Sequence, residues 1–538
     1  MMDKPLLCFK DFVPVWLRIA LFILFAVIFQ CSSPVYLSLM GDVTGAYQLY
    51  REDLSFVYQV STIGVTFIFP ILFRIKFRFT SQQILSVCSL LLASLLLVCM
   101  YTSSVPVLIV CAFFIGAFKM IGTFETLVSL QLIITRQKDY GMFFSVALAI
   151  VLLCGQLSAT LAVILADSYD WQMIYNLVAI LLGIQTLLIL LLLRPFRIVK
   201  PLPLFGIDWI GIFHWSVFFS LISYVLTYGH VLDWYSSEKI TVATITAVLW
   251  LLLIVYRTYT IRRALIVPRV LRLKNVVVAI LVILIAQVML NTTGSILGPF
   301  TGSLMRLDNL HTGGLNWWIA GGILTGAVIG YFWFKYINGP FRIIFAAGFA
   351  ALTLHHGLLY FAFSGSAGEQ QLYLPYFLKG LGNIIIFAAA AKYVTIGVGF
   401  DVFTQMLCYM AMFRNALGNA VMGAFFSENV YRLSQDYLQK LASKIDASRL
   451  EPLAAGIYNQ SLKSGSPSFQ ASQLASKAIA ARLNQQAMLL AGRDIFGWVT
   501  VFGVVVLIGI CLYHFSAHRI RTFPSWGNQY RIVKRDAS

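Results

Sequence analysis

Long apolar runs alternate with short polar segments along the whole chain. A helix that crosses a bilayer needs about 20 mostly apolar residues. Fourteen runs come close to this length or exceed it, near residues 14–39, 54–73, 83–102, 105–134, 141–166, 171–193, 207–229, 239–257, 275–299, 315–337, 341–363, 373–396, 402–426 and 495–516. The pattern predicts an all-α integral membrane protein with fourteen transmembrane helices. The seventh and eighth runs are the weakest, because His214 interrupts them and Asp233 and Glu238 lie close by.

One hydrophilic segment, 427–494, separates the thirteenth run from the last. Spaced apolar positions over 433–450 predict an amphipathic helix there. Gly465, Ser466 and Pro467 are expected to break the helical structure, and a second helix is expected over 470–490. Such a segment either contacts a partner or caps the mouth of a pore, and the sequence leaves both readings open.

Composition supports a membrane protein. The 538 residues are 59% hydrophobic and only 11% charged, whereas soluble domains carry roughly 25% charged residues. A larger soluble core does not explain this deficit, but a surface covered by lipid does.

The formal charge of +18 would suggest nucleic acid as a partner in a soluble protein. Here the basic residues lie in short loops between apolar runs. The N-terminus, the loops on its side and the C-terminal tail, including 519–535, hold 24 Lys and Arg, and the short loops of the other face hold three, Arg51, Lys239 and Arg306. This bias places both termini in the cytoplasm and excludes a nucleic-acid partner.

Motifs of catalysis and metal binding are absent from the sequence. There is no Walker A loop, HExxH pair or nucleophile elbow, so no enzyme activity, cofactor or metal is expected. The eight cysteines form no CxxC pair, and most fall inside apolar runs, where they are expected to act as small buried hydrophobic residues. His355 and His356 are adjacent on one helix, so they point to different faces.

Charged residues within the apolar runs are the candidate functional groups, because each costs roughly 3 kcal/mol in a bilayer. Lys119 lies near the middle of the fourth run, and Glu125 lies further toward the cytoplasm. Six residues place them about 120° apart on a helix, so both could border a wide cavity. A carboxylate withdrawn from water can bind and release a proton near neutral pH. Glu125 is therefore predicted to handle protons or substrate, with a structural ion pair as the alternative.

Two further cations lie in the second half. Arg414 is central in the thirteenth run, where it either lines a cavity or packs helices together through hydrogen bonds. Lys379 lies in the outer part of the twelfth run and is expected to extend toward the membrane surface. Glycine sets such as Gly418 with Gly423, or Gly321, Gly322 and Gly326, are expected to be faces for close helix packing.

Several segments resemble the fourteen-span drug:proton antiporters of the major facilitator superfamily, the EmrB/QacA type. Asp208 and Gly211, within 205–211, resemble the family's Asp-x-x-Gly helix entry. Asp233 and Trp234, within 232–240, resemble its outer loop between two additional helices. Further similar segments are 171–176, 266–275, the Lys379, Gly380 and Gly382 stretch, 414–418 with Gly418, and 483–496.

The resemblance covers nearly the whole chain and implies a major facilitator fold. It implies a six-helix bundle over 1–200, two inserted helices and a loop over 201–274, five helices of a second bundle over 275–426, a periplasmic segment over 427–494, and a last helix with a basic tail over 495–538. It also implies a substrate site near the midplane, alternating access, a bacterial inner membrane, and, for one branch, a periplasmic membrane-fusion adaptor and an outer-membrane channel.

The first half departs from the family pattern. The first run reads Gln30-Cys31-Ser32-Ser33-Pro34 where the family has an acid, and Ala112 stands where it has an arginine. The fifth-span motif is reduced to Gly155 and Gln156. Our hypothesis is that Lys119 and Glu125 replace the missing coupling residues.

These observations favour proton-driven efflux of lipophilic compounds, of the multidrug type, with lipophilic small molecules, protons and membrane lipid as partners. Two alternatives stay open. One is a dedicated exporter or uniporter of a lipid-like metabolite with altered proton coupling. The other is a non-transporting membrane scaffold, against which the charges within the spans argue.

Overall fold

A computed structural model describes residues 8–32, 39–134, 140–196, 204, 207–261, 264–305, 307–363, 368–396, 400–444, 447–465, 467–513 and 515. Some of the positions discussed above lie outside these residues, namely Ser33, Pro34, residue 200, Phe205, Gly206, Arg306, Ser466 and the basic tail 519–535.

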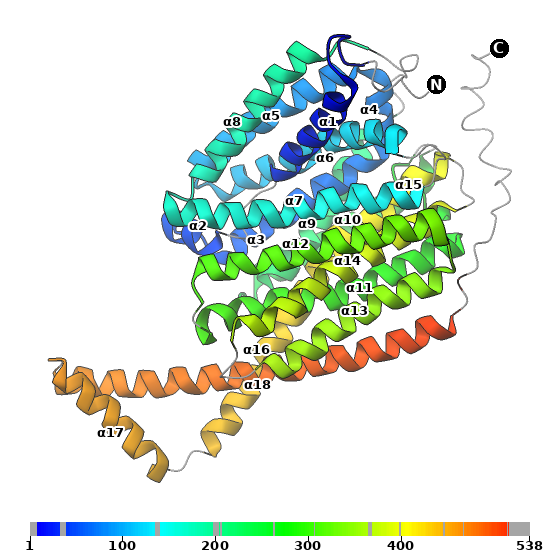
Figure 1. Ribbon diagram of the computed structural model, residues 1–538. Helices are drawn as coiled ribbons and strands as arrows, with labels where there is room; N and C mark the ends of the chain where they lie inside the picture. Colours follow the sequence, from blue (N-terminus) through cyan, green and yellow to red (C-terminus); the bar gives the residue numbers. More distant parts are fainter. Residues whose placement is uncertain are drawn as a thin grey trace.

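The described chain is helical almost throughout (Figure 1). The first part holds α1 (Val15–Cys31), α2 (Met40–Tyr47), α3 (Arg51–Ile68) continued by η3 (Phe69–Ile71) and α4 (Leu72–Arg78), α5 (Ser81–Tyr101), α6 (Val105–Ile134), α7 (Tyr140–Ser168) and α8 (Met173–Leu192). Next come α9 (Trp209–Tyr228), η4 (Trp234–Ser236), α10 (Glu238–Thr260) and η5 (Pro268–Arg272).

The remaining helices form the second part of the molecule. They are α11 (Lys274–Pro299) with η6 (Phe300–Leu304), α12 (Asn309–Phe332) with η7 (Trp333–Ile337), α13 (Phe341–Ala362), α14 (Gln370–Thr395), the continuous rod of α15 (Phe400–Ala411), η8 (Met412–Gly418) and α16 (Asn419–Ser443), then α17 (Ala447–Lys463) and α18 (Ser468–Leu512). The segments η6, η7 and η8 are π-helical.

The predicted all-α membrane fold is confirmed. Among the described residues, 12 helices are long and apolar enough to cross a membrane. The other two predicted runs correspond to α1, a shorter apolar helix, and to the α15–η8–α16 rod. Both weak runs are real helices, α9 and α10, and both are among the 12. The fold is thus two six-helix bundles with two inserted helices.

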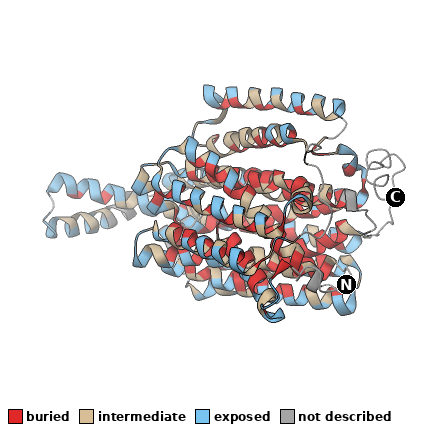
Figure 2. Ribbon diagram, turned by 90° about the horizontal axis from the view of Figure 1, so that it is seen from above, coloured by how far each residue is buried: buried red, intermediate tan, exposed pale blue. Residues whose placement is uncertain are grey.

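Two hydrophobic cores hold the helices together. One is built from α1, α3, α5, α6 and α8, with Phe22, Phe25 and Phe29 of α1 fully buried. The other is built mainly from α11–α16 and α18, and it also takes Phe67 of α3 and Phe219 of α9. Figure 2 shows these buried faces turned inward and the exposed faces turned outward.

Side chains at the helix starts explain several boundaries. Thr80 and Gln83 bond each other's backbone N–H groups and form a capping box at the start of α5. Asp308 accepts from the backbone N–H of His311 at 2.8 Å and caps α12. Each of these caps satisfies an amide that the helix itself leaves without a partner.

The hydrophilic segment 427–494 differs from the prediction. The helix expected over 433–450 ends at Ser443, and α17 begins at Ala447. The helix expected over 470–490 is part of the 45-residue α18, which continues without interruption into the last span. Pro467 precedes α18, and Gly465 has a φ of +87°, as expected for a break. The sequence after Pro467 is rich in Ala, Gln and Leu, which favour a helix, so a change in hydropathy does not end it.

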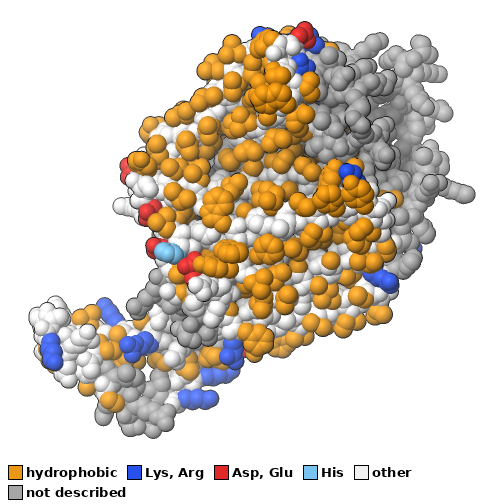
Figure 3. Space-filling model, in the orientation of Figure 1, with side chains coloured by type: hydrophobic (Ala, Val, Ile, Leu, Met, Phe, Trp, Pro, Cys, Tyr) orange, Lys and Arg blue, Asp and Glu red, His pale blue; other side chains and the backbone are white. Residues whose placement is uncertain are grey.

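Apolar side chains cover the outside of the bundle. Figure 3 shows them as a continuous surface on the face drawn, with charged side chains mainly toward the two ends of the helices. Among the exposed apolar side chains are Leu187, Leu249, Trp498 and Val505. The chain is therefore built as a multi-pass membrane protein.

Candidate functional site

The candidate site lies between the two halves of the fold, the first half being α1–α8 and the second half α11–α16 with α18. The helices run roughly side by side (Figure 1). We call the end at which α1 begins and α18 ends the basic end. The opposite end, from which α17 and the start of α18 project, is the hairpin end.

The halves touch at several depths. Near the hairpin end, Thr160 of α7 donates to the Gly313 carbonyl of α12 at 3.2 Å. Further in, Thr62 of α3 donates to the Asn415 carbonyl of η8 at 3.5 Å. At the basic end, α7 approaches the second half so closely that a Cβ on Gly141 would lie 2.5 Å from Lys392 Cδ. The facing surfaces of α3, α7, α12, α14 and η8 therefore form the boundary between the halves.

Three cations named by the sequence lie well inside their spans. Lys119 of α6 is about 23 Å of helix from the basic end of its helix, Lys379 of α14 about 24 Å, and Arg414 of η8 about 21 Å. Each keeps part of its surface accessible although it lies deep within a span. Glu125 is nearer the basic end, about 14 Å along α6.

Lys119 and Glu125 do not share a site. Lys119 lies beside the thiols of Cys31 in α1 and Cys154 in α7. Just below, Gln30 of α1 donates to Thr123 of α6 at 2.8 Å. Lys119 therefore belongs to a contact of α1, α6 and α7.

Glu125 is part of an ion pair near the basic end. Its Oε1 accepts from Lys76 Nζ of α4 at 2.9 Å and from Ser81 Oγ of α5 at 2.6 Å. Its side chain is 2% exposed and that of Lys76 is 7% exposed. Its Oε2 is buried and has no hydrogen-bond partner among the described residues. The arrangement matches the structural ion pair that the sequence left as an alternative.

Lys379 points into the protein, so the expectation that it extends toward the membrane surface is wrong. Its Nζ donates to Thr293 Oγ1 of α11 at 2.5 Å, and Thr293 is fully buried. Thr293 is the acceptor that draws the side chain inward, because a hydroxyl inside a bundle offers an ammonium a partner that lipid does not.

Arg414 stacks on an aromatic ring. Its guanidinium carbon lies 4.0 Å from the centroid of Phe387 of α14, a favourable cation–π geometry. Tyr58 of α3 lies on the side of the other half. Arg414 therefore packs η8 against α14 through this ring, and both roles left open above stay predictions.

Neutral amides and close-packed glycines surround these cations. Asn291 of α11 donates to Gln287 Oε1 at 2.6 Å and to Asn419 Oδ1 of α16 at 3.4 Å. A Cβ on Gly418 would lie 2.9 Å from Gln287, and one on Gly380 would lie 2.1 Å from the Ile319 carbonyl. Three more glycines are also packed too closely for a side chain: a Cβ would lie 2.8 Å from the Gly348 carbonyl at Gly382, 1.9 Å from the Phe377 carbonyl at Gly322, and 2.4 Å from the Ile384 side chain at Gly326. A Cβ on Gly423 would meet open space, and one on Gly321 would make only an ordinary van der Waals contact.

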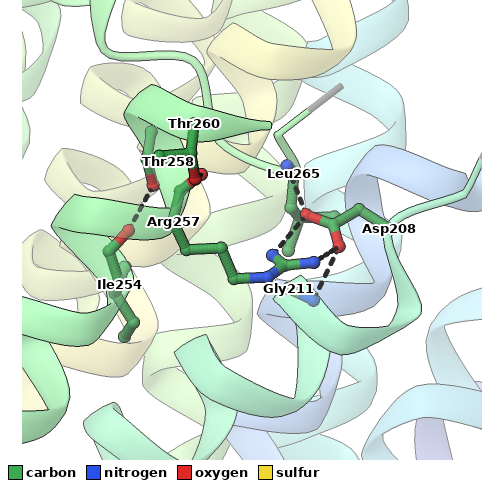
Figure 4. A network of polar contacts seen from close by, with 7 residues as sticks. All are labelled: Asp208, Gly211, Ile254, Arg257, Thr258, Thr260 and Leu265. Carbon is green, nitrogen blue, oxygen red and sulfur yellow. Dashed lines mark hydrogen bonds and ion pairs between the residues drawn. The ribbon is translucent and has the colours of Figure 1, made fainter. Parts of the chain in front are cut away.

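The inserted helices are fastened by Asp208 (Figure 4). Its carboxylate accepts from both terminal guanidinium nitrogens of Arg257, one at 2.9 Å, and from the backbone N–H of Gly211 at 2.8 Å and of Leu265 at 3.1 Å. Burial acts to raise the pKa of Asp208, but the hydrogen bonds from Arg257, Gly211 and Leu265 hold this pKa below its usual value. One carboxylate thus caps α9 and ties it to the end of α10.

The other inserted-loop residues form a tight turn. Asp233 and Trp234 both have positive φ values, and Asp233 is exposed. Trp234 donates from Nε1 to Glu428 of α16 at 3.3 Å. The turn therefore docks α9 and α10 on the second half at the hairpin end.

An apolar groove lies on the first half, away from the boundary. Its volume is about 550 Å³, and α3, α5, α6 and α9 line it with side chains such as Ile68, Val87, Phe114, Phe118 and Trp209. Its lining is almost entirely apolar, so it offers nothing that would hold a charged group.

His355 and His356 bond in different directions, as adjacent helix positions require. His355 Nδ1 lies 2.7 Å from the Pro375 carbonyl of α14, and His356 Nε2 lies 2.8 Å from the Met289 carbonyl of α11. Both histidines thus brace the second core.

Sequence reasoning missed most of the partners. The contacts of Lys76 with Glu125, of Arg257 with Asp208 and of Phe387 with Arg414 join residues far apart in the chain. A usable signal existed only for Asp208, where Gly211 three residues later marks a helix start.

No model of a protein family matches the sequence, and the search of curated proteins found no match. Similar solved structures exist. The nucleoside transporter NupG is 10% identical with a TM-score of 0.53, over 92% of this chain and 98% of that one. The peptide transporter POT in complex with alafosfalin is 15% identical with a TM-score of 0.56, over 94% and 96%. POT in complex with sulfate is 14% identical with a TM-score of 0.55, over 93% and 95%. Such a likeness establishes architecture, and the fold of this chain is that of the major-facilitator-type transporters.

Proposed function

We propose that this protein is a secondary transporter that exports a small lipophilic compound by alternating access, driven by the entry of protons. The observation that carries the proposal is the presence of Lys119, Lys379 and Arg414 deep within spans, the first in one half of the fold and the other two in the other half. Cations in the membrane interior are costly and usually mark a path for substrate or ions. A scaffold would gain nothing from them.

The fold supplies the means of movement. Two bundles joined by inserted helices can rock about a site near the midplane, so that the site opens to each side in turn. The nucleoside and peptide transporters with similar folds carry small molecules, by their names. That analogy supports transport and leaves the substrate of this chain to its own site.

Proton coupling is proposed at Glu125. The free Oε2 can take a proton, and protonation would remove the charge that binds Lys76. The link between α6 and the α4–α5 turn would then loosen at the basic end. In this way a proton could bias the equilibrium between two arrangements of the bundle.

The test is efflux of a lipophilic dye panel (anionic, neutral and cationic) from cells without their own pumps. Wild type, Glu125→Gln and a matched control, Glu238→Gln, are compared with and without a protonophore. Glu238 is an exposed carboxylate at the start of α10, so its loss should leave efflux intact. Coupling at Glu125 is supported if efflux stops with the protonophore and in Glu125→Gln, but continues in Glu238→Gln.

A second function is favoured by one observation. Glu125 is held by Lys76 and Ser81, as a structural carboxylate would be. A dedicated exporter or uniporter without coupling at Glu125 would keep its flux in the presence of the protonophore and in Glu125→Gln. No efflux of any panel compound, with normal expression, would argue against multidrug transport.

We also propose that the hairpin of α16, α17 and α18 faces the periplasm of a bacterial inner membrane and contacts an adaptor there. It projects well beyond the bundle (Figure 1) and is largely polar, with eight Lys and Arg between 427 and 494. A photo-crosslinking residue at exposed Lys477 should capture a second protein, whereas one at Lys239 should not. Equal capture at both positions, or none at Lys477, would contradict an adaptor.

A further inference from the structure

We propose that the transported compound is an organic anion with an apolar body, and that the positive charges of Lys379 and Arg414 attract its acidic group. This inference rests on the proposed transport function and names the substrate class of the same site. It follows from what these two cations contact, and from what they do not.

Lys379 has a neutral partner. Its ammonium can donate three hydrogen bonds, and one of them goes to Thr293 Oγ1 at 2.5 Å. Among the described residues no carboxylate forms an ion pair with it. The positive charge is therefore oriented by a hydroxyl and left without compensation.

Arg414 also lacks an acidic partner within the described chain. The ring of Phe387 covers one face of the guanidinium at 4.0 Å. Stacking uses the face and leaves the N–H donors at the edge, which match carboxylate and phosphate oxygens two at a time.

The described acids that do form ion pairs are committed elsewhere. Glu125 binds Lys76 toward the basic end, Asp208 binds Arg257, and Glu428 binds Arg432 at the hairpin end. An uncompensated charge in the membrane interior is strongly unfavourable. A protein that keeps two such charges within its spans is expected to receive the opposite charge from its ligand.

The surroundings suit the rest of an anionic molecule. On α14, Lys379, Asn383 and Phe387 follow at intervals of four residues and so share one face. Asn383 Oδ1 is buried without a hydrogen-bond partner among the described residues. Phe387 adds aromatic surface beside Arg414. The cations thus fit an acid and the ring fits an aromatic or aliphatic body, whereas the free amide oxygen, an acceptor, fits a donor group on that body.

The first experiment needs no ligand. The purified full-length protein is melted by following tryptophan fluorescence, for wild type, Lys379→Met and the exposed control Lys335→Met. Replacing an uncompensated charge by an apolar side chain of similar shape should not lower the melting temperature. Where the change stabilises the protein, the rise should be roughly 2 °C or more. A fall of several degrees would mean that Lys379 is satisfied as a structural residue, and would overturn the inference.

The second experiment uses four probes with one apolar body: 2-naphthoate, 2-naphthyl phosphate, 2-naphthalenemethanol and 2-naphthylmethylammonium. Only the two anions should raise the melting temperature, as a ligand of the folded state does. Lys379→Gln and Arg414→Gln should each weaken anion binding by about tenfold or more, and Lys335→Gln should not. If a Gln variant fails to fold, Arg414→Lys, which keeps the charge, takes its place and should weaken binding less.

Three results would overturn the anion site. They are equal shifts from the neutral or cationic probe, no shift from either anion, and an anion shift that survives in the Lys379→Gln/Arg414→Gln double variant. Failure of the transport proposal looks different. Anion binding without efflux in cells would refute transport and keep the anion site. Efflux of neutral or cationic compounds without anion binding would refute the anion site and keep transport.

Discussion

Asp208→Asn is expected to destabilise the protein through the junction of the inserted helices. The carboxylate of Asp208 receives four hydrogen bonds, two from Arg257 and one each from the backbone N–H of Gly211 and Leu265. It thereby joins the start of α9, the end of α10 and the segment that follows. Asparagine has nearly the same shape, so the change removes charge and one acceptor without opening a cavity.

The magnitude follows from the burial of the pair. The side chains are 7% exposed for Asp208 and 18% exposed for Arg257, so water replaces little of what is lost. Removing one partner of a buried pair costs about 3–5 kcal/mol, and the partial exposure of Arg257 favours the lower end, about 3 kcal/mol. The melting temperature of the purified protein should fall by several degrees.

A double-mutant cycle tests the cause. Asp208→Asn, Arg257→Gln and the double variant should show strong coupling, with the double variant no worse than Asp208→Asn alone. Additive effects, or a fall of less than a degree in Asp208→Asn, would refute the reasoning.

The pH dependence has a definite sign. Hydrogen bonds hold the pKa of folded Asp208 below its usual value. The contribution of Asp208 to the free energy of unfolding is therefore fully present above the pKa of the unfolded state, about 3.9. The contribution is lost as pH falls through the folded pKa. The difference in melting temperature between wild type and Asp208→Asn should stay constant from about pH 7 to pH 5 and narrow below about pH 4. A difference that narrows near neutral pH would contradict this assignment.

Two further predictions concern packing and orientation. Gly322→Ala should destabilise by about 1–3 kcal/mol, because a Cβ there would lie 1.9 Å from the Phe377 carbonyl. Gly321→Ala, whose Cβ would meet the Phe377 ring at 3.7 Å, should have little effect, and equal melting temperatures for the two variants would contradict the packing account. A reporter that works only in the cytoplasm should be active when it is fused after Tyr513. A reporter that works only in the periplasm should be active when it is inserted at Gly465. The opposite pattern would reverse the proposed orientation.

The positions of the spans could be read from the sequence for a physical reason. Lipid offers backbone groups no hydrogen bonds, so a crossing segment must be a helix, and it must be apolar over its length. Even α9 and α10, with His214 in one and acids beside both, keep this signature. The extension of α18 beyond the membrane could not be read this way, because hydropathy reports the solvent around a helix and not where the helix ends.

Partners of the buried charges were beyond the sequence for a related reason. A helix surrounded by lipid on one side and protein on the other is apolar on both faces, so its inward face cannot be identified from hydropathy. The order of Lys119 and Glu125 along their run was readable, but the prediction that both border one cavity did not foresee that Glu125 pairs with Lys76. The ion pair of Glu125 with Lys76, and the inward turn of Lys379 toward Thr293, depend on neighbours that only the folded chain brings together.

Alternating movement of the two halves is tested most directly by a reversible staple between them. A Cβ on Gly313 of α12 would lie 3.3 Å from Val163 Cβ of α7, close to the separation in a disulfide, about 3.8 Å. In the Val163→Cys/Gly313→Cys variant, oxidation should stop efflux of any panel compound that wild type carries, and a reductant should restore it. Each single-cysteine variant should be indifferent to both treatments. Mass spectrometry reports how much of the double variant carries the disulfide. Full efflux by fully disulfide-bonded protein would contradict movement of the halves at the hairpin end.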